Sequence, residues 1–185
     1  MVLETERLIL REFQEGDVEA VYEYGSDAEA NKYVSWGPKS EEDAVEFVRK
    51  ALVDQQEQPR SAFNFAVVTR TDNKLIGRCG ISTRGMTVDI PNSKEEAEIG
   101  YAINRKYWNQ GYVTEAAKRV LQFGFEELGL HRIYASCRAA NIASVHVIEK
   151  TGMKFEGRLR HYKFARGDRP DSLLYSIFKQ EWKGK

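Results

Sequence analysis

The sequence predicts an α/β fold: a single domain over residues 1–185, with a mixed central sheet and helices on both faces. Three observations predict it. Three β-rich runs follow one another between residues 62 and 104, which indicates an antiparallel meander. Later strand runs alternate with helical patterns, which indicates βαβ units. The length of 185 residues suits one domain, and such a chain buries about 70% of the surface that it exposes when unfolded.

We expect about seven strands, in the order βαα βββ α β α ββ. Residues 7–13 are rich in β-formers and predict the first strand. Asp17 is a suitable N-cap for a short helix that ends near Tyr24. Ser40 followed by acidic residues indicates a variant of the capping box, which opens a helix that ends near Gln56.

The remaining elements are predicted from the helical and strand spacings of their apolar residues. The strongest helical pattern covers residues 113–128, where apolar side chains recur at i, i+3 and i+4. A shorter helix over residues 141–150 is ended by Gly152. The further strands are expected at residues 62–69, 74–82, 96–104, 131–138, 154–164 and 173–181.

The composition excludes several classes of protein. Lys+Arg and Asp+Glu both number 28, so net charge gives no argument for nucleic acid or an anionic membrane as a partner. No apolar run approaches the roughly 20 residues that span a bilayer. Cys79 and Cys137 lack a metal-ligand spacing, as do the histidines, so we expect no metal and two buried free thiols in a reducing cytoplasm.

Gly111 stands between a strand run and the long helix. A helix that starts there leaves the N–H groups of its first turn without partners, and the missing Cβ lets an anion approach them. The helix dipole favours the same anion. On spacing alone a plain turn is the favoured explanation, because glycine is common at such turns, and neither a Walker loop nor a dinucleotide fingerprint is present. The N–H groups expected at a phosphate belong to Gln110, Gly111, Tyr112, Val113 and Thr114.

The run from Trp108 to Ala116, W-N-Q-G-Y-V-T-E-A, resembles the acetyl-CoA loop of the GNAT superfamily of N-acetyltransferases. It is most similar to the ribosomal-protein N-terminal acetyltransferases of the RimJ/RimL type, which read roughly W-G-x-G-Y-A-T-E-A. Val113 departs from that pattern and crowds the approach to the pyrophosphate. The resemblance covers about residues 5–182. It implies the GNAT fold, acetyl-CoA as cosubstrate and an amine acceptor, with a protein N-terminus favoured.

A second motif begins N-x-x-S at Asn141 and Ser144. Both residues suit a helix start, so helix capping alone would account for them. The family resemblance implies more: Asn141 binds the pantetheine arm of CoA, and Ser144 lies near the thioester sulfur. Many members place a tyrosine acid where this chain has Ile148. That leaves Ser144, directly or through a water, or no dedicated acid.

The strand expected at residues 96–104 carries Glu98 on the same face as two small residues. The resemblance implies that acetyl-CoA fills a gap between this strand and the one from His131. The thioester oxygen would then meet a backbone N–H near Ile103 or Asn104. Glu98 is the candidate general base for the attacking amine. The alternatives are that it only holds the amine by charge, or pairs with an arginine.

Of the components of the expected reaction, the acceptor is the one that the sequence defines least. Tyr33 and Trp36 lie in a loop that lines the acceptor cleft in this family, although core packing would explain both. An α-amine, with a pKa near ~8, needs less help than a lysine amine. The alternatives are a small-molecule enzyme of the polyamine or antibiotic type, and a non-catalytic acyl-CoA sensor. The final strands are the expected contact of a homodimer, because exposed edges pair.

Overall fold

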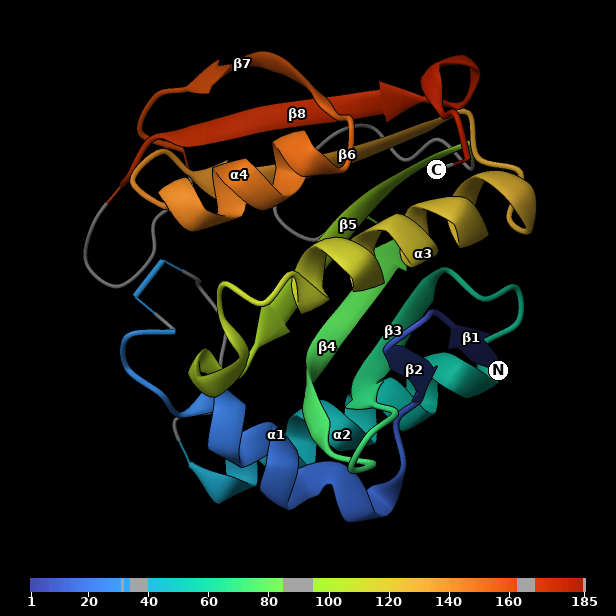
Figure 1. The fold of residues 1–185 in the computed structure, drawn as a ribbon, viewed down its shortest axis with the longest axis vertical. Helices are drawn as coiled ribbons and strands as arrows, with labels where there is room; N and C mark the ends of the chain where they lie inside the picture. Colours follow the sequence, from blue (N-terminus) through green and yellow to red (C-terminus); the bar gives the residue numbers. More distant parts are fainter. Residues whose placement is uncertain (31, 34–39, 85–94, 163–168, 185) are drawn as a thin grey trace.

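In the computed structural model the chain forms an eight-stranded mixed sheet in the order β1-β2-β3-β4-β5-β6-β8-β7 (Figure 1). The structure describes residues 1–30, 32–33, 40–84, 95–162 and 169–184. The strands are β1 (Val2–Glu4), β2 (Leu8–Glu12), β3 (Ala62–Thr69), β4 (Leu75–Ser82), β5 (Glu96–Ile103), β6 (Arg132–Arg138), β7 (Lys154–Leu159) and β8 (Ser172–Phe178). The helices are α1 (Val18–Gly25), α2 (Glu41–Gln56), α3 (Tyr112–Glu126) and α4 (Ile142–Lys150).

The predicted α/β class and element order are confirmed, with two differences at the ends of the chain. β1 was not expected, and it raises the strand count above the predicted one. Its three residues are too few to show a period, and they form a strand because β2 offers an antiparallel partner. β7 and β8 are shorter than expected, since β7 ends at Leu159 and β8 at Phe178.

Both predicted cap residues, Ser40 and Asp17, precede a helix, but only Ser40 makes the capping hydrogen bonds. Ser40 caps α2: its Oγ accepts the Asp43 N–H at 3.2 Å, and Asp43 Oδ2 accepts the Ser40 N–H in return. Asp17 precedes α1 as predicted, but it makes no cap bond to the helix. Its carboxylate instead accepts two hydrogen bonds from the guanidinium of Arg11, both at 2.7 Å, because a buried carboxylate needs a partner.

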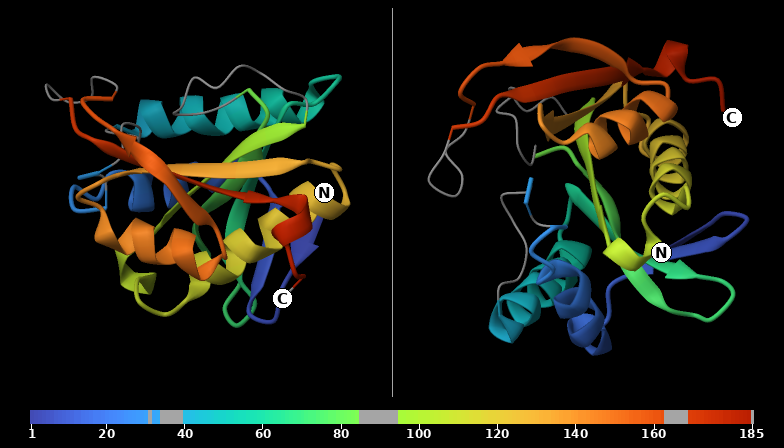
Figure 2. Two further views of the ribbon diagram at one scale, coloured as in Figure 1. Left: turned by 90° about the horizontal axis from the view of Figure 1, so that it is seen from above. Right: turned by 60° about the vertical axis from the view of Figure 1, so that its left-hand side comes forward.

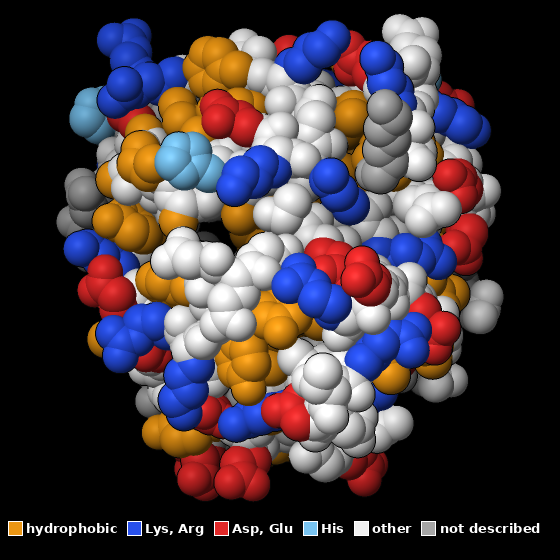
Figure 3. All heavy atoms as spheres, viewed as in Figure 1, with side chains coloured by type: hydrophobic (Ala, Val, Ile, Leu, Met, Phe, Trp, Pro, Cys, Tyr) orange, Lys and Arg blue, Asp and Glu red, His pale blue; other side chains and the backbone are white. Residues whose placement is uncertain are grey.

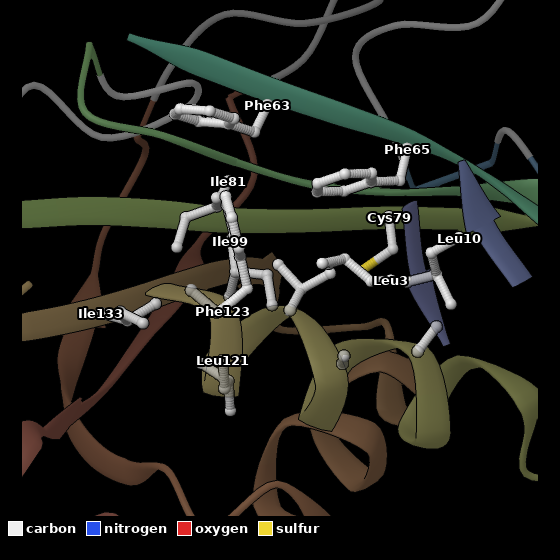
Figure 4. Close-up of a cluster of buried hydrophobic side chains, with 14 of the residues drawn as sticks. Leu3, Leu10, Phe63, Phe65, Cys79, Ile81, Ile99, Leu121, Phe123 and Ile133 are labelled. Carbon is white, nitrogen blue, oxygen red and sulfur yellow. The ribbon is translucent and has the colours of Figure 1, made fainter. Parts of the chain in front are cut away.

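Helices cover both faces of the sheet. α2 lies on one face with α1, and α3 and α4 lie on the other (Figure 2). The larger core fills the space between the sheet and α3. Phe123 of α3 packs edge-on against Phe63 and Phe65 of β3, with ring centroids 5.2 and 5.6 Å away (Figure 4). This packing fixes the C-terminal half of α3 against the sheet.

The sheet has β1 at one edge and β7 at the other. β7 is largely exposed, and Phe155 on it keeps 56% of its surface in solvent. The homodimer contact expected at the final strands therefore concerns β7, since β8 lies inside the sheet. Within the part of the chain that the structure describes, no helix has the length and apolar character needed to cross a bilayer.

Candidate functional site

β5 and β6 run parallel and separate soon after they begin. Their register pairs end at Glu98 and Tyr134, whereas β5 continues to Ile103 and β6 to Arg138. Figure 1 shows the two strands together at one end and apart at the other. A cavity of about 860 Å³ opens there, lined by both strands and by the starts of α3 and α4. Figure 3 shows the surface hollowed on this side of the molecule.

Most of the predicted site residues meet at this cavity. Those on its wall are Tyr33, Glu98, Ile103, Gly111, Tyr112, Val113, Thr114, Asn141 and Ser144. Asn104 and Gln110 are adjacent to lining residues but are not on the wall. The Asn104 N–H already donates to the Ile76 carbonyl at 2.7 Å, and the Gln110 side chain donates to the Lys106 carbonyl at 3.0 Å. Trp36 lies outside the described residues.

The start of α3 differs from the starts of α2 and α4. Those two helices have side-chain caps, from Ser40 and Asn141. The N-cap of α3 is Gly111, which has no side chain to offer and a φ of +81°, in the left-handed region that favours glycine. The first-turn N–H groups therefore face the cavity without a cap. We refer to the backbone N–H groups of residues 110–114 as the cradle, because an uncapped helix start suits an anionic group.

A group of contacts from the connection between β1 and β2 holds the cradle. Glu115 accepts hydrogen bonds from Thr5 Oγ1 at 2.6 Å, the Arg7 N–H at 2.9 Å and Arg7 Nε at 2.7 Å. Arg7 also donates to the Gln110 carbonyl at 3.0 Å and lies 4.5 Å above the Tyr112 ring. Burial alone would raise the pKa of Glu115, but the bonds from Thr5 and Arg7 outweigh it and lower the pKa.

Arg7 was missed at the sequence level. Its Nη2 lies 3.3 Å from the position that a Cβ on Gly111 would take, so a cation stands beside the cradle although the motif contains no lysine. Trp108 has a clear structural role as well. Its Nε1 donates to the Ile103 carbonyl at 3.1 Å and fixes the loop before α3 to the end of β5.

Glu98 lies on the cavity wall at the last residue pair that joins β5 to β6. Only 2% of it is exposed, and Ser136 Oγ on β6 donates a hydrogen bond to Glu98 Oε1 at 3.1 Å. Burial, with the nearby charge of Glu98, raises the pKa of the Tyr134 phenol to about 12, so that phenol is neutral at physiological pH. The site thus has a buried carboxylate where the two strands separate.

The second motif forms the opposite wall. Asn141 Oδ1 accepts the Ser144 N–H at 3.1 Å, so Asn141 caps α4 as its residue type suggests. The Ser144 hydroxyl lies 2.9 Å from the Tyr101 hydroxyl. Burial raises the pKa of Tyr101 above its usual value. Cys137 lines the cavity nearby, and burial raises its pKa to about 11.

Tyr101 lies on the same core-facing side of β5 as Ile99 and Ile103, and a helix from another part of the chain determines where its hydroxyl ends. Ile148 is 2% exposed and packs in the same core. The position that carries a tyrosine in many members is therefore apolar here, and the phenol near Ser144 comes from β5.

Comparison with known proteins identifies the family of this chain. The sequence profile described as "Acetyltransferase (GNAT) domain" matches residues 7–154. The uncharacterized N-acetyltransferase YnaD of Bacillus subtilis (strain 168) is 37% identical over 182 residues, which covers 98% of this chain and 99% of the relative. Spermidine N(1)-acetyltransferase of Escherichia coli (strain K12) is 26% identical over 173 residues, 94% of this chain and 87% of that protein.

A solved structure shares the fold. RimL, a ribosomal L7/L12 alpha-N-protein acetyltransferase in complex with coenzyme A, matches with a TM-score of 0.81 over 96% of this chain and 98% of its own. The two sequences are 20% identical, so this similarity is one of fold.

Proposed function

Because the chain belongs to the GNAT acetyltransferase family and is an acetyl-CoA-dependent N-acetyltransferase, we propose that its acceptor is the α-amine at a protein or peptide N-terminus. The observation that carries the proposal is the buried Glu98 carboxylate, which faces the same cavity as the cradle. The amine attacks directly in a ternary complex. A covalent enzyme intermediate is not needed, and the raised pKa keeps Cys137 protonated rather than nucleophilic at neutral pH.

The cradle is the proposed site of the CoA pyrophosphate, with Arg7 beside it. When bound, acetyl-CoA supplies an acetyl group activated as a thioester. The NH₂ group of Asn141 holds the pantetheine arm. Of the two N–H groups proposed for the thioester oxygen, that of Asn104 already has a sheet partner, so we assign the role to Ile103.

Glu98 acts as the general base in this scheme. An α-amine with a pKa near ~8 is partly protonated at physiological pH, and only its neutral form attacks. The hydrogen bond from Ser136 fixes the orientation of the carboxylate, and burial shields it from bulk solvent. A carboxylate held in this way accepts the proton that the amine must lose, directly or through one water.

Ser144 supports the leaving sulfur. The Tyr101 hydroxyl has two acceptors on Ser144, the carbonyl oxygen at 3.2 Å and Oγ at 2.9 Å. When it donates to Oγ, the hydroxyl proton of Ser144 can point toward the cavity. A raised pKa keeps Tyr101 protonated, so its role is to position Ser144 rather than to lose a proton itself. Since a thiol has a free pKa near ~8.5, the leaving thiolate needs only this modest help.

The second candidate acceptor is a polyamine, because one relative acts on spermidine. It shares the cosubstrate site and differs in the acceptor half of the cavity. Two further proposals are secondary. A cytoplasmic location suits the free thiols of Cys79 and Cys137, and a homodimer through β7 suits the exposed Phe155.

Release of the CoA thiol with matched acceptors tests the proposal. One peptide has a free N-terminus, a second has a blocked N-terminus and a free lysine, and the third acceptor is spermidine. We expect turnover of the first peptide and none of the second. Turnover of spermidine alone contradicts the N-terminal acceptor. Binding of acetyl-CoA without turnover of any amine identifies a sensor.

A further inference from the structure

The cavity wall between the sheet and helices α1 and α2 has two glycines at its centre. The register of β4 with β5 places Arg78, Gly80 and Ser82 opposite Ala102, Gly100 and Glu98. Paired residues of antiparallel strands point to the same face. Arg78 and Glu98 therefore lie on one face, at the two ends of a floor whose middle positions on β4 and β5 are glycines. The Asn64 side chain of β3 borders this floor, since its Oδ1 lies 2.6 Å from the position that a Cβ on Gly80 would take.

Arg78 defines one end of this floor. It lines the cavity with 8% of its surface exposed, and its Nη1 donates to Asn64 Oδ1 at 3.3 Å. Its guanidinium carbon lies 5.8 Å from the centroid of the Phe47 ring. Tyr24 of α1 lines the same part of the cavity and is 2% exposed. Its hydroxyl has no hydrogen-bond partner among the described residues.

This end of the cavity suits an anion. Burial raises the pKa of Tyr24, against the nearby charge of Arg78, so the hydroxyl is a neutral donor. Burial lowers the pKa of Arg78, yet a guanidinium stays charged in proteins. A buried cation and a buried donor hydroxyl are both stabilised when a carboxylate accepts hydrogen bonds from them.

The opposite end carries the negative charge of Glu98. Ala102, the register partner of Arg78, is four residues from Glu98 on β5, a distance of roughly 13 Å. An extended peptide covers that distance in about four residues, and the two side chains shorten it. The other carboxylate on this wall, Asp54, is paired with Arg84 at 2.8 Å. A polyamine would place a second ammonium group against Arg78, which is unfavourable.

We propose that Arg78 and Tyr24 bind a carboxylate of the acceptor, so that this enzyme prefers peptides with an acidic side chain at the second or third position from the amine. The inference rests on the proposed acetyl transfer and narrows its acceptor to acidic peptides. It explains why a buried arginine and a buried tyrosine face the cavity on the side away from the cradle.

Amidated tetrapeptides that differ only in glutamate or glutamine, at the second or third position, test this inference. In the wild type we expect kcat/KM to be at least about tenfold higher for a glutamate peptide, chiefly through KM. Arg78→Gln removes the preference. Tyr24→Phe keeps the ring and reduces the preference about threefold or more. Calorimetric affinity for acetyl-CoA, unchanged in both variants, shows that they are folded.

Arg49→Gln is the matched control, because it removes an exposed cation of α2 that pairs with Glu46. It should leave the preference intact. Equal kcat/KM for glutamate and glutamine peptides overturns the inference, as does a preference that survives both cavity variants. Calorimetric binding of the same peptides to the CoA-loaded protein distinguishes a failure of the proposed anion site from a failure of the proposed acetyl transfer. Selective binding of glutamate peptides without turnover supports the anion site and refutes the acetyl transfer, whereas turnover without selectivity does the reverse.

Discussion

Replacing Glu115 with glutamine is expected to lower the free energy of unfolding by about 1–2 kcal/mol at pH 7. Glutamine keeps an oxygen for the bonds from Thr5 Oγ1 and the Arg7 N–H, but it loses the charged contact with Arg7 Nε at 2.7 Å. Hydrogen bonds to charged groups contribute about 1.5–3 kcal/mol. The Arg7 side chain is 43% exposed, so solvent screening favours the lower end of that range.

The effect should depend on pH in a defined direction. The folded-state pKa of Glu115 is lowered, because the bonds from Thr5 and Arg7 outweigh burial. Its contribution is therefore complete above the unfolded pKa of about 4.3 and is lost as the pH falls through the lower folded value. Urea unfolding of both proteins should show a difference that shrinks from about pH 5 toward about pH 2.

Glu46→Gln is the control, since Glu46 also pairs with an arginine, Arg49 at 2.6 Å, but both side chains are more than 60% exposed, at 61% and 63%. Its removal should change stability by no more than about 0.5 kcal/mol. The reasoning is refuted if Glu115→Gln is as stable as the wild type at pH 7. It is also refuted if the two substitutions cost the same.

Three further predictions concern the reaction site. Glu98→Gln should lower kcat about 100- to 10,000-fold and leave acetyl-CoA affinity unchanged, because glutamine takes no proton, and an unchanged kcat contradicts the base role. Tyr101→Phe removes the contact of 2.9 Å with Ser144 and should lower kcat about tenfold with little change in KM for acetyl-CoA, whereas a loss of thermal stability alone contradicts positioning. The thiol of Cys137, with its pKa near 11, should react slowly with iodoacetamide at pH 7 and faster toward pH 11. Bound CoA should slow the reaction of Cys137, and the buried Cys79 should stay unmodified. Rapid alkylation of Cys137 at pH 7 refutes the burial argument.

The elements that the sequence predicted well are those with local signals. The apolar stripe of α3 and the Ser40 cap of α2 depend on residues within a few positions of each other. β1 lacks such a signal, because its three residues become a strand only through pairing with β2. The partner of Asp17 was missed for a similar reason: a cation from β2 competes with the helix N–H groups for its carboxylate.

The candidate site shows the same difference between local signals and contacts of distant segments. Gly111, Asn141 and Glu98 belong to motifs whose spacing is visible in the chain, and all three line one cavity. The contacts that give the site its chemistry join distant segments. Arg7 reaches Glu115 across 108 positions, and Tyr101 reaches α4 across 43. No periodicity within either segment encodes such a contact, so it appears only once the fold is known.

Calorimetric titration with acetyl-CoA tests the central claim most directly. Three proteins are needed: the wild type, Gly111→Asp, and Gly129→Asp as control. Gly129 is also left-handed, with φ of +69° and open space around it, and does not line the cavity. We predict that the wild type and the control bind while Gly111→Asp does not, because its carboxylate repels the pyrophosphate at the cradle. Equal binding by all three proteins, or none by the wild type, would contradict the account.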